Sequence, residues 1–164
     1  MRTLVVGGTG MLGGVVTALA NDGDHVTVLA RRGWRGGSVQ GRVSSLLLGY
    51  RQTGTLELAL KHNGLFDRMV AWIHPDTPGA FGILQQVVTG DVLCVLGSAD
   101  ADPGFPARIP AAGEPREVIL GFVREAGHSR WLTDAEISVG VLQALCSGEP
   151  RSVVGTVTPW SERP

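Results

Sequence analysis

Short apolar runs alternate along this chain with segments whose apolar residues recur every three or four positions. Uninterrupted apolar runs between glycines and polar residues are typical of strands buried on both faces of a sheet. Such runs predict strands at residues 4–6, 25–29, 43–48, 66–73, 91–96, 117–123 and 153–157. Helical spacing and capping residues predict helices over 11–21 and 53–63 (with Thr53 as cap), a helix that begins at Pro78 and includes Val87 and Val88, and a helix from Thr133 to Gly148. Alternating strands and helices indicate an α/β fold, doubly wound in three layers around a mostly parallel sheet of six to seven strands.

Three segments interrupt this alternation. Residues 33–41 are polar and rich in glycine, so the helix expected after the second strand is short or missing. Residues 98–115 are rich in Ala, Pro and Gly, and we expect a loop there and another over 127–132. A chain of 164 residues, 43% apolar and 18% charged, suits one globular domain, so we read 1–164 as a single domain.

A glycine turn joins the first strand to the first helix. It satisfies two spacings at once, Gly8-x-Gly10-x-x-Gly13 and Gly7-x-x-Gly10-x-x-Gly13. Between a strand and a helix, such glycines permit a tight turn, close approach of the backbone to a pyrophosphate, and helix–strand packing. We therefore expect a dinucleotide site of the Rossmann type; the alternative is a glycine turn that binds nothing. The residues assigned to it are Gly7, Gly8, Thr9, Gly10, Met11, Leu12 and Gly13.

The P-loop is excluded as an alternative, because it needs a Lys-Ser/Thr pair at the end of its glycine loop. Gly13-Gly14 stands at that place, and Lys61 is the only lysine of the sequence.

The residues after the second strand select the cofactor in this type of site. A carboxylate there holds the ribose hydroxyls of NAD, whereas an arginine accepts the 2′-phosphate of NADP. The strand is followed by Arg31 and Arg32, and no carboxylate lies between Asp24 and Glu57. We therefore predict NADP(H); a solvated basic loop is the alternative.

Composition limits the other partners. The net charge is −1, so we expect no nucleic-acid or membrane partner, and no run of 18 apolar residues predicts a membrane span. The two cysteines, Cys94 and Cys146, have no partners at metal-ligand spacing. We interpret them as buried free thiols in a reducing cytoplasm, and we predict a cytoplasmic protein without a metal site.

Further candidates lie where the strands end, because parallel sheets bind ligands at their carboxyl ends. His74 follows the fourth strand, and its side chain titrates near neutrality, so it is a candidate acid or cofactor contact as well as a simple turn residue. Ser98 follows the fifth strand and is a candidate catalytic hydroxyl or a loop residue. Tyr50 follows the third strand and either edges the adenine pocket or is structural. His128, with Arg130 and Trp131, either closes over the site or forms a polar surface loop.

The glycine turn with Arg31-Arg32 resembles the short-chain dehydrogenase/reductase superfamily. Later segments are similar to a group of small bacterial Rossmann proteins usually labelled short-chain dehydrogenases. These segments are residues 70–74, 118–123, 129–138 and 154–160. The resemblance implies that Ser98 matches the catalytic serine of the superfamily. The superfamily also uses a Tyr-x-x-x-Lys pair on a helix after the fifth strand, and this sequence lacks that pair, because its only tyrosine is Tyr50 and its only lysine is Lys61.

Three functions are compatible with these residues. The first is an NADPH-dependent reductase of the short-chain dehydrogenase type, which acts on a small-molecule imine or an activated C=C or C=O with His74 and Ser98 as catalytic candidates. The second is a non-catalytic NADP(H)-binding sensor or partner protein. The third is a non-redox isomerase or cyclase on the same scaffold. Because the missing helix usually builds the dimer interface of the superfamily, we also expect a homo-oligomer that forms through another surface.

Overall fold

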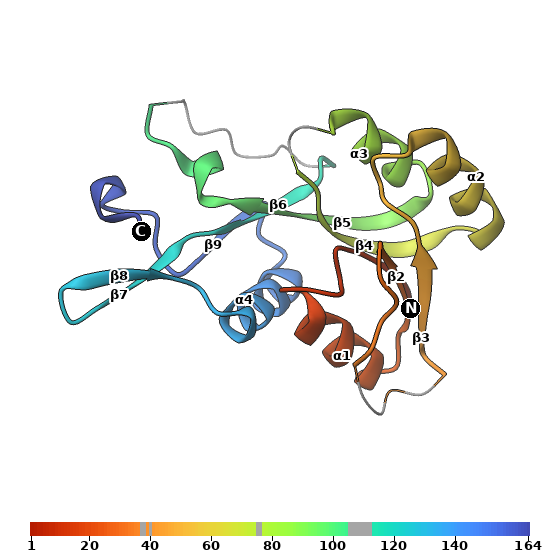
Figure 1. Cartoon of the computed structure of the whole chain (residues 1–164), viewed down its shortest axis with the longest axis horizontal. Coiled ribbons are helices and arrows are strands. Elements are labelled where there is room, and N and C mark those ends of the chain that lie inside the picture. The colour runs from red at the N-terminus through yellow and green to blue at the C-terminus, as the bar shows by residue number, and fades with distance from the viewer. Residues whose placement is uncertain (37–38, 40, 75–76, 105–112) are drawn as a thin grey trace.

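A seven-stranded sheet runs through the molecule with the strand order β3-β2-β1-β4-β5-β6-β9 (Figure 1). The computed structural model describes residues 1–36, 39, 41–74, 77–104 and 113–164. The strands of the sheet are β1 (Arg2–Val6), β2 (His25–Ala30), β3 (Val43–Leu47), β4 (Phe66–Trp72), β5 (Val88–Gly97), β6 (Arg116–Leu120) and β9 (Arg151–Val154). All six pairings are parallel, which confirms the predicted doubly wound α/β class.

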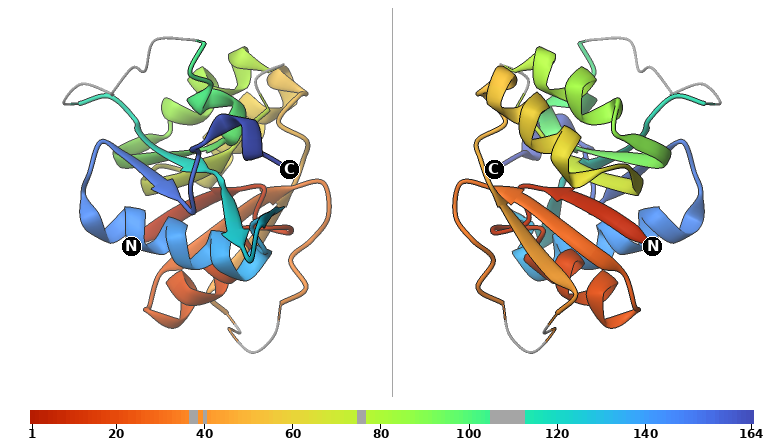
Figure 2. Two further views of the ribbon diagram at one scale, coloured as in Figure 1. Left: turned by 90° about the vertical axis from the view of Figure 1, so that its left-hand side faces the viewer. Right: turned by 90° about the vertical axis from the view of Figure 1, so that its right-hand side faces the viewer.

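Helices cover both faces of this sheet (Figure 2). The helices are α1 (Gly13–Asn21), α2 (Thr53–Asn63), α3 (Pro78–Gln85) and α4 (Asp134–Ser147). One buried cluster joins α1 and α4 to the sheet through residues such as Val16 and Val141, and a second joins α2 and α3 through Leu60 and Leu84. Successive residues of a strand face opposite layers, so the continuous apolar runs in the sequence supply both clusters.

Close packing of α1 on α4 positions the glycine turn. A Cβ atom built on Gly14 would lie 2.6 Å from Oγ of Ser138, so no larger residue fits without displacing one of the helices. The same hydroxyl donates a hydrogen bond to the carbonyl of Met11 at 3.1 Å. Helix α4 therefore holds the start of α1 in place.

Several predicted element boundaries were wrong. Helix α1 begins at Gly13, two residues later than expected, and Thr53 is the first residue of α2 rather than its cap. Helix α3 ends at Gln85, because Val88 pairs with Phe66 and opens strand β5. The β-branched valine is accommodated in the ladder, where its side chain packs against neighbouring strands.

The predicted strand over 117–123 is two strands. It breaks at Gly121, after which Phe122 leaves the parallel ladder and pairs with Thr156; only glycine fits at the break, because a Cβ there would clash with the Thr156 backbone. The predicted loop over 127–132 was also wrong. An antiparallel hairpin forms there from β7 (Phe122–Glu125) and β8 (His128–Trp131). Ala126 and Gly127 both have positive φ, as a tight two-residue hairpin turn requires.

Residues 155–164, here called the C-terminal strap, fold back over the base of this hairpin. Phe122 and Thr156 exchange two backbone hydrogen bonds of 2.9 Å. A short 3-10 helix over Trp160–Glu162 follows, and Glu162 forms an ion pair of 2.5 Å with Arg124 of the hairpin. The sequence predicted a last strand over 153–157, but strand β9 ends at Val154.

The predicted loop after β5 begins with a 3-10 helix, Ser98–Ala101, and its residues 105–112 lie outside the described residues. Within the part of the chain that the structure describes, no helix has the length and apolar character needed to cross a bilayer.

Candidate functional site

The glycine turn places one glycine in a conformation that other residues rarely adopt. Gly7 has φ +84°, and its N–H donates to the carbonyl of Leu29 at 3.1 Å. A Cβ at Gly8 would lie 2.9 Å from Val16, so Gly8 makes the tight helix–sheet contact expected of a glycine in this turn. A Cβ at Gly10 would meet nothing within 4 Å. The backbone at Gly10 is therefore open to the approach of a ligand.

The turn also presents backbone donors at the start of α1. Gly10 and Gly13 donate within the turn, to Gly7 at 3.4 Å and to Gly10 at 2.8 Å. Other turn N–H groups have no protein acceptor among the residues that the structure describes: those of Gly8, Thr9, Met11 and Leu12. Unpaired donors at a helix N-terminus, together with the helix dipole, suit the phosphates of a dinucleotide.

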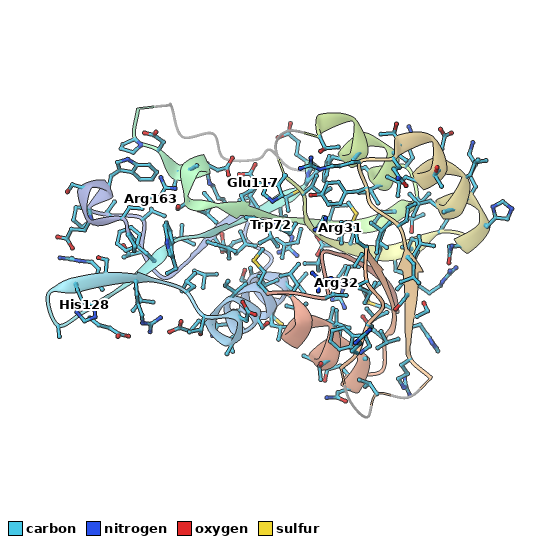
Figure 3. All side chains as sticks on the ribbon, in the orientation of Figure 1. Arg31, Arg32, Trp72, Glu117, His128 and Arg163 are labelled. Carbon is cyan, nitrogen blue, oxygen red and sulfur yellow. The ribbon has the colours of Figure 1, made fainter. Side chains whose placement is uncertain are left out.

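Arg31 and Arg32 follow β2 at the same edge of the sheet, and both side chains are exposed. Neither forms an ion pair with a described residue. In Figure 3, Trp72 lies between these two arginines on one side and Arg163 on the other. Two unpaired guanidinium groups beside the turn are suited to an additional phosphate.

Trp34 lies beside the turn, a position that the sequence analysis did not predict. Its indole ring is 3.6 Å from where a Cβ of Gly13 would be, and the backbone N–H of Trp34 donates to Oγ of Ser45 at 2.9 Å. The ring packs against the α1–α4 cluster, in the segment after β2 where no helix forms among the described residues. The feature of the sequence that could have indicated this position is an aromatic residue within a glycine-rich polar stretch.

Tyr50 and His74 meet after β3 and β4. The backbone N–H of His74 donates to the Tyr50 hydroxyl at 3.3 Å, and the His74 ring lies edge-on to Trp72 with 5.9 Å between the ring centres. The structure thus brings together two predicted cofactor contacts from different loops. The side chain of His74 is exposed.

A cavity of about 300 Å³ opens where β4, β5 and β6 end, and we call it the tryptophan cavity. Trp72 connects the cavity to the glycine turn. The Cβ of Trp72 lies 3.5 Å from where a Cβ of Gly7 would be, and the far end of the Trp72 ring lies 3.6 Å from where a Cβ of Gly97 would be. Ser98 lines the cavity and is only 5% exposed. Its hydroxyl has no hydrogen-bond partner among the described residues and is available to a ligand.

His74 lines a different cavity, of about 230 Å³, with Cys94 and Glu117. The two catalytic candidates, His74 and Ser98, are therefore not brought into one cavity. Burial, followed by the charge of Glu117, raises the pKa of the Cys94 thiol to about 12, so this thiol is not a nucleophile near neutrality. Cys94 is half-buried and Cys146 is exposed, which corrects the expectation of two buried thiols.

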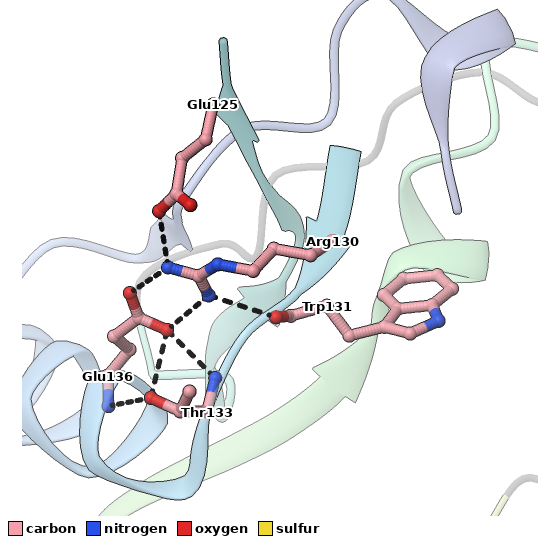
Figure 4. Close-up of polar contacts among 5 residues, drawn as sticks. All are labelled: Glu125, Arg130, Trp131, Thr133 and Glu136. Carbon is pink, nitrogen blue, oxygen red and sulfur yellow. Dashed lines mark hydrogen bonds and ion pairs between the residues drawn. The ribbon is translucent and has the colours of Figure 1, made fainter. Parts of the chain in front are cut away.

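The hairpin forms one wall of the tryptophan cavity, and a charged network fixes its position (Figure 4). Arg130 bridges Glu125 at 2.6 Å and Glu136 at 2.9 Å, and Glu136 completes the capping box of Thr133. Hydrogen bonds from Arg130 and Thr133 lower the pKa of Glu136 to about 2. The side chain of Trp131 points away from this network in Figure 4 and lines the cavity.

Arg163 of the strap is a residue of this site that sequence reasoning missed. Its guanidinium carbon lies 5.4 Å from the ring centre of Trp131 and 5.0 Å from that of Trp160, and the residue lines the tryptophan cavity. His128, by contrast, lies at the far end of the hairpin (Figure 3) and is not among the residues that line this cavity. Among the described residues, no cluster of three metal-ligating side chains occurs.

Neither a family model nor a curated protein sequence matches the chain. Solved structures of similar fold include a short-chain dehydrogenase from Burkholderia cenocepacia in complex with NADP, at 13% identity and TM-score 0.71, covering 95% of this chain and 88% of the other. A short-chain dehydrogenase from Leptospira borgpetersenii with bound NAD+ has 11% identity and TM-score 0.64, and the match covers 94% of this chain and 91% of the other. A short-chain dehydrogenase/reductase from Serratia marcescens has 17% identity and TM-score 0.61, covering 93% and 94%. This chain therefore has the Rossmann-type fold found in short-chain dehydrogenases.

Proposed function

We propose that this protein binds NADP(H) along the carboxyl ends of its strands and reduces a small molecule in the tryptophan cavity. The observation that carries the proposal is the glycine turn, where Gly7 has positive φ and several N–H groups at the start of α1 lack acceptors among the described residues. Two solved structures of similar fold contain NADP or NAD+. Arg31 and Arg32, unpaired among the described residues, favour the phosphorylated cofactor.

Each part of the site has a role in this proposal. The turn N–H groups hold the pyrophosphate, Arg31 and Arg32 bind the 2′-phosphate, and the Tyr50–His74 pair lines the adenosine side. The cofactor supplies a hydride when bound. Ser98 donates a hydrogen bond to the substrate, and Trp72 provides an apolar wall beside it. The cavity and the turn share Trp72, so substrate and cofactor sites adjoin.

The substrate class that we propose depends on which proton donors the described residues offer. The Tyr50 hydroxyl oxygen accepts a hydrogen bond from the backbone N–H of His74, and Lys61 lies on α2 in an ion pair of 2.8 Å with Glu57, so we do not assign these two residues as a proton-donating pair. An iminium carbon already carries positive charge and accepts hydride without protonation of an oxyanion. We therefore propose an imine or an activated double bond as substrate.

The test is calorimetric titration with NADPH and with NADH. We expect tighter binding of NADPH, and we expect Arg31→Ala to weaken it by roughly ten- to a hundredfold, the range for hydrogen bonds to a charged group. NADH affinity changes little in this variant. The matched control is Arg42→Ala, because Arg42 is also exposed but binds the Gly23 carbonyl away from the turn. The absence of binding by either nucleotide would contradict the proposal. Oxidation of NADPH with a panel of imines, enones and ketones then tests the reductase.

A non-catalytic NADP(H) sensor is the second candidate. The separation of His74 and Ser98 into different cavities favours it, because no general acid adjoins the Ser98 hydroxyl among the described lining residues. It predicts tight NADPH binding without oxidation by any panel member, and a protein partner whose association depends on the nucleotide.

A further inference from the structure

We propose that the tryptophan cavity binds a small, flat molecule that bears a carboxylate, and that Arg163 is the residue that selects this group. The inference deepens the proposed function and rests on it only in treating this cavity as the substrate side of the site. Three observations support the proposal: Arg163 has no ion pair with a described residue, the walls of the cavity are mostly apolar, and ion pairs hold the hairpin and the strap in place.

Among the described residues, Arg163 has no carboxylate partner. The acid next to it in sequence, Glu162, is paired with Arg124 at 2.5 Å, and no ion pair joins Arg163 to a described residue. Contacts with Trp131 and Trp160 lie within the range of cation–π interactions, which use the faces of the guanidinium. The N–H groups at the edge of the guanidinium remain available, and their fork matches the two oxygens of a carboxylate.

The walls of the cavity favour a flat apolar body. Apolar side chains dominate them, including Trp72, Trp131, Leu132 and Ile137, and no Asp or Glu is among the described lining residues. The polar side chains are those of Ser98 and Arg163. A volume of about 300 Å³ is at the lower end of the range for small-molecule pockets. This combination is complementary to an aromatic or conjugated ring with one negative charge and one further polar group.

Contacts within the protein hold both supports of Arg163 in place. The Arg130–Glu136 pair holds the hairpin, and therefore Trp131, on helix α4. The Arg124–Glu162 pair and the Phe122–Thr156 hydrogen bonds hold the strap on the hairpin. These contacts lower the amount of order that the hairpin and the strap must gain on binding, so more of the interaction with a carboxylate appears as affinity.

The test compares three probes that share a ring, namely benzoate, benzamide and phenyl phosphate, by titration of tryptophan fluorescence. We expect the wild-type protein to bind benzoate at least about tenfold more tightly than benzamide, in line with a charge-assisted hydrogen bond. In Arg163→Gln this preference disappears, and in Arg163→Lys part of it remains. Arg42→Gln, which removes the same charge elsewhere, keeps the preference. Thermal melts of the variants show that each is folded.

Each result bears on the proposal separately from the cofactor. Three results would overturn the proposal: equal affinities for benzoate and benzamide, a benzoate preference that survives in Arg163→Gln, or no binding of benzoate. Preferred binding of phenyl phosphate would overturn the carboxylate assignment in favour of a phosphate ester. NADPH titration of the same proteins is independent. A benzoate preference without NADPH binding would leave this inference standing and refute the proposed function, and the reverse would refute only the inference.

Discussion

Gly121 is the position where a single methyl group is expected to detach the C-terminal strap. It lies between β6 and β7, and the chain near Thr156 passes directly against it. A Cβ at Gly121 would lie 2.7 Å from the carbonyl carbon of Thr156, nearer still to its oxygen, and 3.1 Å from the carbonyl oxygen of Val154. These neighbours are backbone atoms, so no side-chain rotation relieves the overlap in Gly121→Ala.

The cost follows from the hydrogen bonds that must lengthen when the end of β9 and the strap move away from Gly121. The Gly121 N–H donates to Val154 at 3.0 Å, and Phe122 and Thr156 exchange two bonds of 2.9 Å. At about 0.5–1.5 kcal/mol net for each bond, the loss of these three destabilises the protein by roughly 2–4 kcal/mol. Displacement of the strap also removes Arg163 from Trp131, so the benzoate preference falls together with stability.

The assay is urea unfolding followed by circular dichroism, with tryptophan emission as a second probe of the strap. The matched control is Gly82→Ala on α3, where a Cβ meets nothing within 4 Å. That variant is expected to be more stable than the wild type by about 0.5–1 kcal/mol, because alanine loses less backbone entropy in a helix. A Gly121→Ala protein whose unfolding free energy lies within about 0.5 kcal/mol of the wild type would refute this reasoning.

Three further measurements test other parts of the structure. Asp24→Ala removes the carboxylate that Arg68 contacts at 2.5 Å. We expect urea unfolding to show a free energy of unfolding lower by about 3 kcal/mol, the lower end for a broken buried ion pair. An unchanged unfolding midpoint would contradict this. Hydrogen bonds, first of all from Arg130, lower the pKa of Glu136 from 4.5 to about 2. The contribution of the Glu136 carboxylate to stability is therefore full above about pH 4.5 and is lost as the pH falls toward 2. The melting temperatures of the wild type and Glu136→Gln should differ above pH 5 and converge near pH 2. Burial raises the pKa of the Cys94 thiol to about 12. Iodoacetamide at pH 8 should therefore modify the exposed Cys146 in the native protein and leave Cys94 intact, as measured by mass spectrometry. Equal labelling of both cysteines would show that the Cys94 thiol is not protected.

The sequence by itself determined the layered architecture and the glycine turn. Both are local in origin: continuous apolar runs specify strands covered on two faces, and the glycines occur within one strand–turn–helix unit. The capping box at Thr133 was likewise predictable, because its two partners lie three residues apart. For the same reason Arg31 and Arg32 could be placed at the end of a strand.

The tertiary structure alone decided where the strands break and which side chains share a cavity. The break at Gly121 depends on Thr156, thirty-five residues later in the chain, and the strand start at Val88 depends on its pairing with Phe66. Local patterns carry no information on such approaches, because they arise from the return path of the chain. For this reason Arg163 was not predicted as part of the site.

The sequence also left open which catalytic candidates meet. Trp72 packs into the α1–α4 layer and Ile73 into the α2–α3 layer, because successive residues of a strand point to opposite faces. His74 and Ser98 both follow strand ends, yet they line different cavities: Ser98 shares one with Trp72, and His74, beyond the end of β4, shares the other with Ile73. The chain order places both residues at one edge of the sheet, and only the three-dimensional packing assigns each to its cavity.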